Sequence, residues 1–306
     1  MTIKKDLLAI GHTPLDYIIT VDEFPKANNS APMKTMLNLN GGAAANVAMI
    51  GANLGFKTGL VSAVGREFID SHYHKEMTKL GVDTEALIIS ESESTPTAFV
   101  MTNNNQDQIS YFYWGAGKEF HDSEVPREKI REFKAVHLAT GDPHFNCKSG
   151  IVAKEEERLV SFDPGQDLGM YSPKKLKEVI NNVNILFGNH HEIKRIQDSL
   201  GVDINGLMEF GPEIVLTTCG KEGSFIYSLD EGKIEIESIY RPAVDPTGAG
   251  DSYKAGFISQ FINGKTLEES AKFASSVSSF VVEKQGCQTN MPSYDDAYNR
   301  MVEFYK

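Results

Sequence analysis

Residues 244–257 read VDPTGAGDSYKAGF, a run of small residues between two carboxylates that leads directly into a helical pattern. Gly248, Ala249 and Gly250 leave their backbone N–H groups accessible, because none of them carries a bulky side chain. The start of a helix adds further unpaired N–H groups and a positive potential. The stretch therefore predicts an anion site, with Asp251 as either a simple helix cap or a general base beside that site.

A carboxylate beside an anion site suits the transfer of a phosphoryl group to a hydroxyl. Asp251 would take the proton of the hydroxyl, and the backbone N–H groups would stabilise the charge that develops on the phosphoryl oxygens. A glycine-rich turn alone is more often only a helix cap, so the choice between the two interpretations depends on the rest of the chain.

Short apolar strands alternate with helical patterns over most of the 306 residues. Strands are predicted at 7–10, 59–65, 135–140, 158–163, 184–189 and 213–218, and helices at 43–54, 70–80, 173–182, 192–200, 249–263, 267–283 and 294–304. This alternation predicts an α/β fold with a mainly parallel sheet that helices cover on both faces. Ligands of such sheets bind beyond the carboxyl ends of the strands, where Asp163, Asn189 and Thr218 are expected.

Two segments interrupt the alternation. Residues 15–21 are strand-like and lead into a stretch up to Asn40 that we expect to be irregular. Residues 95–115 predict a β-hairpin, because apolar residues alternate along both arms of a polar turn. We expect residues 1–306 to form one continuous domain. Residues of about 12–40 and 95–115 are expected to form a small β lid on this domain.

Charge and composition argue against several classes of protein. A nucleic-acid-binding protein usually carries a basic face, whereas this chain has a net charge of -12 and a pI near 5.2. Cys147, Cys219 and Cys287 show neither metal-ligand spacing nor a disulfide framework, so we expect reduced thiols and a cytoplasmic protein. The sequence contains no run of 18 apolar residues, and its start makes a poor signal peptide, so no membrane association is expected.

Five motifs, in a fixed order, resemble those of the ribokinase / phosphofructokinase-B family of small-molecule kinases. DPTGAGD (245–251) resembles the C-terminal signature of that family, and NGGAAANVAMIGANLG (40–55) resembles its N-terminal signature. The other matches are GHTPLD (11–16), NHHE (189–192) and TCGKEG (218–223). Together they span almost the whole chain, whereas one alone would be weak evidence. The resemblance implies a three-layer αβα ribokinase-like core and a kinase that uses ATP and Mg²⁺.

The resemblance implies a role for individual positions. Asp251 would be the general base, and the N–H groups of Gly248, Ala249 and Gly250 would form the anion hole. The substrate would be held by Asp16, Gly41, Gly42, Asn46 and Gln166. The residues that line the nucleotide would be Asn189, Thr218, Gly220, Gly223, Thr247 and Gly286. Gly286 would lie near the adenine or near a loop that binds a monovalent cation such as K⁺. Asn189 and Glu192 would hold Mg²⁺ through water, although Glu192 alone could equally be a capping carboxylate.

The chain departs from the family pattern after a middle strand. Many sugar kinases of the family carry Asp-Pro-Asn-x-Arg there, whereas residues 163–167 read DPGQD, with Gly165 for the asparagine and Asp167 for the arginine. A standard sugar-kinase assignment is therefore in doubt. The stretches TGDPHFN, SFDPGQDL, FYWGAG and GCQTN instead resemble the archaeal nucleoside kinases of the same family.

The distribution of cations favours a neutral substrate. A kinase for a phosphorylated sugar needs a lysine or arginine at that phosphate, but neither residue occurs between Lys79 and Lys118, the interval that contains the predicted hairpin. Lys26, Lys34 and Arg66 could still supply a charge.

Aromatic residues of the predicted hairpin could stack on a nucleobase, and Phe99 and Phe112 are the candidate contacts. They could equally hold a sheet or a dimer interface together.

We expect a kinase that transfers the γ-phosphate of ATP to the ribose 5′-hydroxyl of a nucleoside, with purine nucleosides favoured. The alternatives are a ribokinase or other neutral-sugar kinase, and a non-catalytic nucleoside- or sugar-binding protein. The intact Asp251 argues against the last. An exposed edge strand favours a homodimer through the lid.

Overall fold

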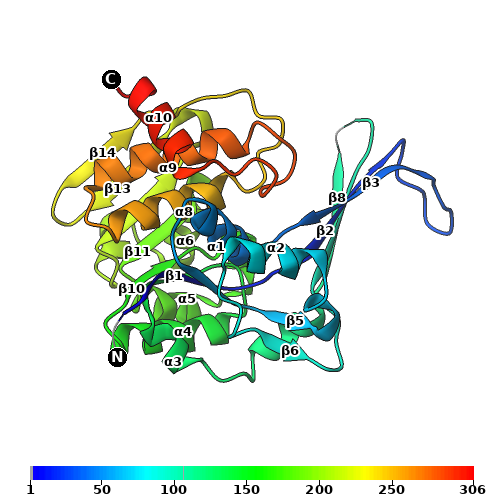
Figure 1. Ribbon diagram of the computed structural model, residues 1–306, viewed down its shortest axis with the longest axis horizontal. Coiled ribbons are helices and arrows are strands. Elements are labelled where there is room, and N and C mark those ends of the chain that lie inside the picture. The colour runs from blue at the N-terminus through cyan, green and yellow to red at the C-terminus, as the bar shows by residue number, and fades with distance from the viewer. Residues whose placement is uncertain (1–2, 106) are drawn as a thin grey trace.

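An eight-stranded sheet forms the centre of the computed structural model, which describes residues 3–105 and 107–306 (Figure 1). Its strand order is β14-β13-β12-β11-β10-β9-β1-β4. The parallel strands are β1 (Lys5–Ile10), β4 (Thr58–Val61), β9 (Phe133–Leu138), β10 (Leu159–Phe162), β11 (Ile185–Asn189) and β12 (Ile214–Thr218). The antiparallel strands at one edge are β13 (Ser224–Ser228) and β14 (Gly232–Ile236).

Helices cover both faces of this sheet and bury a separate apolar cluster on each. One cluster includes residues of α1 (Ala43–Asn53), α2 (His72–Leu80), α8 (Ala249–Phe261), α9 (Leu267–Val281) and α10 (Tyr294–Phe304). The other includes residues of α3 (Arg127–Arg131), α4 (Pro143–Glu155), α5 (Pro173–Ile180), α6 (His190–Leu200) and α7 (Ile204–Met208). Consecutive residues of β1 alternate between the clusters, with Leu7 in the first and Leu8 in the second. The predicted three-layer αβα core with a mainly parallel sheet is confirmed.

A second sheet projects from the core and forms the lid (Figure 1). Its strand order is β3-β2-β7-β8, from β2 (Leu15–Val21), β3 (Met33–Asn40), β7 (Thr97–Thr102) and β8 (Gln108–Tyr113). Strands β2 and β7 are parallel, and the two outer pairs are antiparallel. Gln106, in the predicted turn of the hairpin, lies outside the described residues.

The expectation of an irregular stretch up to Asn40 is wrong for residues 33–40. These residues form β3, which pairs with β2 from Leu15 opposite Asn40 to Val21 opposite Met33. Most of β3 is exposed to solvent because it is an edge strand of a projecting sheet. Its sequence therefore lacks the alternation of buried and exposed residues that marks a half-buried strand.

The predicted strand at 59–65 is divided in the structure. Strand β4 belongs to the core, whereas β5 (Ala63–Gly65) pairs with β6 (Ile88–Ser90) in a separate two-stranded sheet. Short 3-10 turns occupy Arg66–Phe68, Gly115–Phe120, Gly165–Met170 and Gly220–Glu222. Within residues 3–105 and 107–306, no helix has both the length and the apolar composition needed to cross a membrane.

Candidate active site

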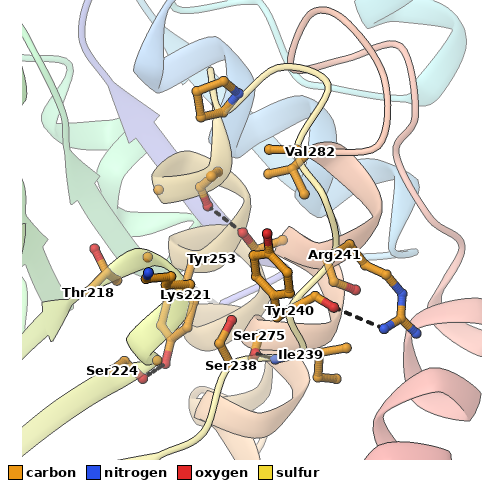
Figure 2. Close-up of a pocket in the computed structure, with 18 residues that line it drawn as sticks. Thr218, Lys221, Ser224, Ser238, Ile239, Tyr240, Arg241, Tyr253, Ser275 and Val282 are labelled. Atoms are coloured by element: carbon orange, nitrogen blue, oxygen red, sulfur yellow. Dashed lines mark hydrogen bonds between the residues drawn. The ribbon is translucent and has the colours of Figure 1, made fainter.

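Two hollows in the surface meet at the N-terminus of α8. The larger is a cleft of about 1330 Å³ between the lid strands and the carboxyl ends of β10, β11 and β12. The smaller, of about 300 Å³, lies between the start of β13, the segment that follows β14, and helices α8 and α9 (Figure 2). Thr218, Gly220, Ala249 and Gly250 line both hollows. Two molecules bound in the two hollows would therefore approach each other at this helix N-terminus.

The backbone at this N-terminus is shaped by glycine. Gly248 is the N-cap of α8 in a left-handed conformation with φ of 79°, and a Cβ added to it would lie 2.1 Å from Sγ of Cys287. A Cβ at Gly250 would meet no described atom within 4 Å, so this residue borders open space. The Ala249 N–H donates to the Pro246 carbonyl at 3.2 Å. The Ala249 N–H therefore already has an acceptor, whereas the expected anion hole of Gly248, Ala249 and Gly250 requires this N–H to be free.

Both oxygens of the Asp251 carboxylate are held in place. Asn46 Nδ2 donates to one oxygen at 2.8 Å, and Lys254 Nζ lies 2.9 Å from the other. Gln288 Nε2 in turn donates to Asn46 Oδ1 at 2.9 Å and to the Tyr73 hydroxyl at 2.6 Å. Side chains from α1, α8, α2 and the segment after α9 therefore fix the orientation of the predicted base.

Lys254 is a buried cation that the sequence analysis missed. Its Nζ lies 2.6 Å from Asp163 Oδ2, at the carboxyl end of β10, and its side chain is only 8% exposed. Burial alone would lower the pKa of Lys254, but the charges of Asp163 and Asp251 more than offset burial, so the pKa is raised. The ammonium group therefore stays charged and reduces the repulsion between the two carboxylates. The sequence does contain one signal for this contact: Lys254 follows Asp251 by three residues, and residues three apart are neighbours on a helix.

Asn189 and Glu192 form a capping box at the start of α6. The Asn189 side-chain oxygen accepts hydrogen bonds from the backbone N–H groups of His191 at 2.9 Å and Glu192 at 3.0 Å. The Asn189 N–H donates to the Glu192 carboxylate at 2.7 Å. The capping interpretation of Glu192 is therefore correct. Because the Asn189 oxygen already has two donors, it is poorly suited to be a direct metal ligand.

The surroundings of Glu192 nevertheless suit a hydrated cation. Burial raises the pKa of Glu192, and the charge of Asp163 raises it further. Of the carboxylates that line the cleft, those of Asp163 and Asp251 act on Glu192 together with one compensating lysine, Lys254. A Mg²⁺ ion bound through its own water molecules would relieve this crowding. Among the described residues, no group of three or more His, Cys, Asp and Glu side chains forms a metal cage.

The predicted substrate residues border the larger cleft. Asp16, Gly42, Asn46 and Gln166 line it. Gly41 lies behind Asp16, because a Cβ at Gly41 would be 2.0 Å from the Asp16 carboxylate. Burial raises the pKa of Asp16 to about 7. Whether ionised or protonated, a buried carboxyl group of this kind has an oxygen that can accept a hydrogen bond from a hydroxyl of a bound sugar.

The two candidate base contacts lie on opposite faces of the lid. Phe112 lines the cleft together with Ala98 and Val100 of the neighbouring strand β7. Phe99 stacks on Tyr17, with the ring centroids 5.2 Å apart. Because successive residues of a strand point to opposite faces, Phe99 points away from the cleft that Ala98 and Val100 line. The expectation that Phe99 contacts a base is therefore wrong.

The predicted nucleotide residues divide between the two hollows. Thr218, Gly220 and Gly223 line the smaller one, whereas Asn189 and Thr247 line the larger. Gly286 is not among the described residues that line either hollow. The Gly286 N–H donates to Asp245 at 2.9 Å, and Gly286 packs against Leu39. This position indicates a structural role, in which Gly286 supports the loop before α8 through Asp245. Tyr240 and Arg241 also line the smaller hollow (Figure 2), but no sequence motif marked them.

Comparison with known proteins identifies a family and two similar relatives. The pfkB family of carbohydrate kinases matches residues 4–294. The chain is 54% identical over 302 residues to a protein of Methanothermobacter thermautotrophicus named nucleoside kinase, covering 99% of this chain and 97% of the relative. It is 41% identical over 298 residues to a protein of the same name from Methanocaldococcus jannaschii, covering 97% of each.

The crystal structure of the Methanocaldococcus jannaschii nucleoside kinase, described as an archaeal member of the ribokinase family, has the same fold. Its TM-score to this chain is 0.94 at 40% sequence identity, and the match covers 99% of this chain and 100% of that one. The order of the motifs, the three-layer core and these matches lead to one conclusion. The chain belongs to the pfkB family of carbohydrate kinases.

Proposed function

We propose that the protein is a nucleoside kinase that uses ATP and Mg²⁺ to phosphorylate the ribose 5′-hydroxyl of a nucleoside, with purine nucleosides favoured. The observation that carries the proposal is the meeting of the two hollows at the N-terminus of α8. A nucleotide in the smaller hollow and a nucleoside in the cleft would meet at Ala249 and Gly250, next to Asp251, which lines the cleft. The relatives named nucleoside kinase, which match over nearly their whole length, support the same class of acceptor.

The charges around the cleft support a neutral acceptor. Among the described residues that line the cleft, Lys254 is the only lysine or arginine, and Asp163 and Asp251 already neutralise it. Lys34 and Arg66 pair with carboxylates at the surface of the protein. A phosphate group on the acceptor would therefore lack the cation that it needs.

Asp251 would act as the general base in this reaction. It takes the proton of the 5′-hydroxyl while the hydroxyl oxygen forms a bond to the γ-phosphorus, and the bond to the bridging β-phosphate oxygen breaks to release ADP. The Gly250 N–H and the N-terminus of α8 stabilise negative charge on the transferring group. Asn46 and Lys254 hold the carboxylate in the required orientation. Mg²⁺, held through water near Glu192, would supply charge neutralisation to the phosphates.

Replacement of the base tests this function. The variant Asp251→Asn keeps the side-chain shape but cannot accept the proton, so kcat should fall by about a hundredfold or more. The KM for inosine or adenosine should change little, because ground-state binding does not depend on that proton transfer. Steady-state ADP release measures both quantities. A variant with a kcat close to that of the wild type would refute the assignment of Asp251.

Replacement of Lys254 tests the buried ion pairs. Lys254→Met leaves two buried carboxylates without a cation, so the free energy of unfolding in urea should fall by about 3–5 kcal/mol. The double variant Lys254→Met/Asp163→Asn removes one of the two charges and should recover part of the lost stability. If the single variant is as stable as the wild type, Lys254 does not compensate these carboxylates.

We further propose a homodimer through the outer face of the lid, where Met36, Phe99 and Ile109 are exposed. Light scattering on a sizing column should give the wild type the mass of a dimer. Ile109→Glu should give the mass of a monomer, because a charge would then lie in the interface. Tyr298→Glu, an exposed change on α10, is the matched control and should leave the dimer intact. A monomeric wild type would exclude this interface. A cytoplasmic location and a response to K⁺ stay predictions.

A further inference from the structure

The cleft contains a buried polar pair that the phosphoryl-transfer chemistry does not use. His12 lies just after β1 and is 3% exposed, and Asp167 lies in the turn after β10 and is 9% exposed. Both residues line the cleft. His12 Nε2 is 3.8 Å from Asp167 Oδ2, which is too long for a hydrogen bond.

These two side chains have unused hydrogen-bonding capacity. In the part of the chain that the structure describes, both ring nitrogens of His12 and the Oδ2 atom of Asp167 lack a hydrogen-bond partner. Buried polar atoms are almost always paired in folded proteins, because an unpaired one loses its bonds to water without compensation. Three such atoms on two neighbouring side chains of one cleft indicate a place where a ligand supplies the partners.

The protonation states define what this ligand must offer. Burial lowers the pKa of His12 to about 4 and raises the pKa of Asp167 to about 6. At neutral pH the imidazole is therefore uncharged, with one N–H donor and one acceptor nitrogen, and most of Asp167 is a carboxylate. The pair presents a donor beside an acceptor, so a complementary ligand carries an acceptor beside an N–H donor.

Aromatic rings surround His12. The His12 ring centroid lies 5.0 Å from that of Trp114, 5.5 Å from that of Phe120 and 6.1 Å from that of Phe112. Trp114 and Phe112 also line the cleft. Flat apolar walls next to a few polar atoms suit an aromatic heterocycle better than a sugar, whose hydroxyls need partners in many directions.

We propose that His12 and Asp167 recognise the hydrogen-bonding edge of the nucleobase and so determine substrate specificity. Asp167 accepts a hydrogen bond from a base N–H, and His12 donates one to the neighbouring nitrogen or oxygen of the base. This inference rests on the proposed nucleoside kinase function.

Paired ligands test the contact to Asp167 directly. Titration calorimetry should measure Kd for inosine against 1-methylinosine, and for adenosine against N6,N6-dimethyladenosine, each methylated ligand lacking the N–H of its parent. For the nucleoside whose base the pair recognises, the wild type should bind the methylated form about tenfold to a hundredfold more weakly than the parent nucleoside. In Asp167→Ala this discrimination should largely disappear, because the acceptor is gone. Discrimination of the wild-type size in the variant would overturn the proposal.

Further variants separate recognition from folding. His12→Phe keeps an aromatic ring but removes both nitrogens, so nucleoside affinity should fall while the Kd for ATP stays unchanged. Asp122→Ala, at an exposed carboxylate outside the cleft, is the matched control and should keep both affinities. An equal loss of nucleoside and ATP affinity in His12→Phe would indicate a structural role and contradict the proposal. If the wild type binds no nucleoside at all, the proposed function itself fails. If it binds nucleosides without any effect of Asp167→Ala, only this inference fails.

Discussion

A single buried ammonium group, that of Lys254, holds the carboxyl end of the sheet and the start of α8 together. It lies within 3 Å of Asp163 after β10 and of Asp251 in the first turn of α8. Without this cation, two buried carboxylates would repel each other across the floor of the cleft. Asn46 adds a second link, from α1 to the same Asp251 carboxylate. The orientation of the Asp251 carboxylate, the proposed base, therefore depends on side chains from three separate parts of the chain.

The two hollows adjoin different chemical groups. The smaller hollow adjoins the backbone donors of α8, and the larger cleft adjoins the carboxylates and the lid. Positive potential from the helix N-terminus is available where a phosphate would arrive, whereas the acceptor side carries no uncompensated cation among its described residues. The same charge distribution that would favour phosphoryl transfer would thus also disfavour an acceptor that already carries a phosphate.

Local patterns predicted much of the fold and marked the stretch that we propose to be catalytic. The run at 245–251 combines small residues, a helix start and a carboxylate, and all of these lie next to one another in the sequence. Helix α10 was predicted with the correct bounds, and in the structure Ser293 caps it. Strand β3 was missed because an exposed edge strand has no burial period to reveal it.

The remaining parts of the site depend on contacts between distant residues. Lys254 and Asp163 are 91 positions apart, and His12 and Asp167 meet only because β1 and β10 both flank β9. The difference between Phe99 and Phe112 depends on which face of the lid each residue occupies, and that face is set by strand register. No local pattern contains this information.

The most direct measurement is the rate of ADP formation from ATP and Mg²⁺ with adenosine, inosine, guanosine, cytidine, ribose and fructose 6-phosphate as alternative acceptors. A nucleoside kinase with a neutral, base-recognising cleft should turn over nucleosides, purine nucleosides above all, with a far higher kcat/KM than ribose, and should not use fructose 6-phosphate. Turnover of ribose or fructose 6-phosphate without turnover of any nucleoside would contradict the proposed substrate.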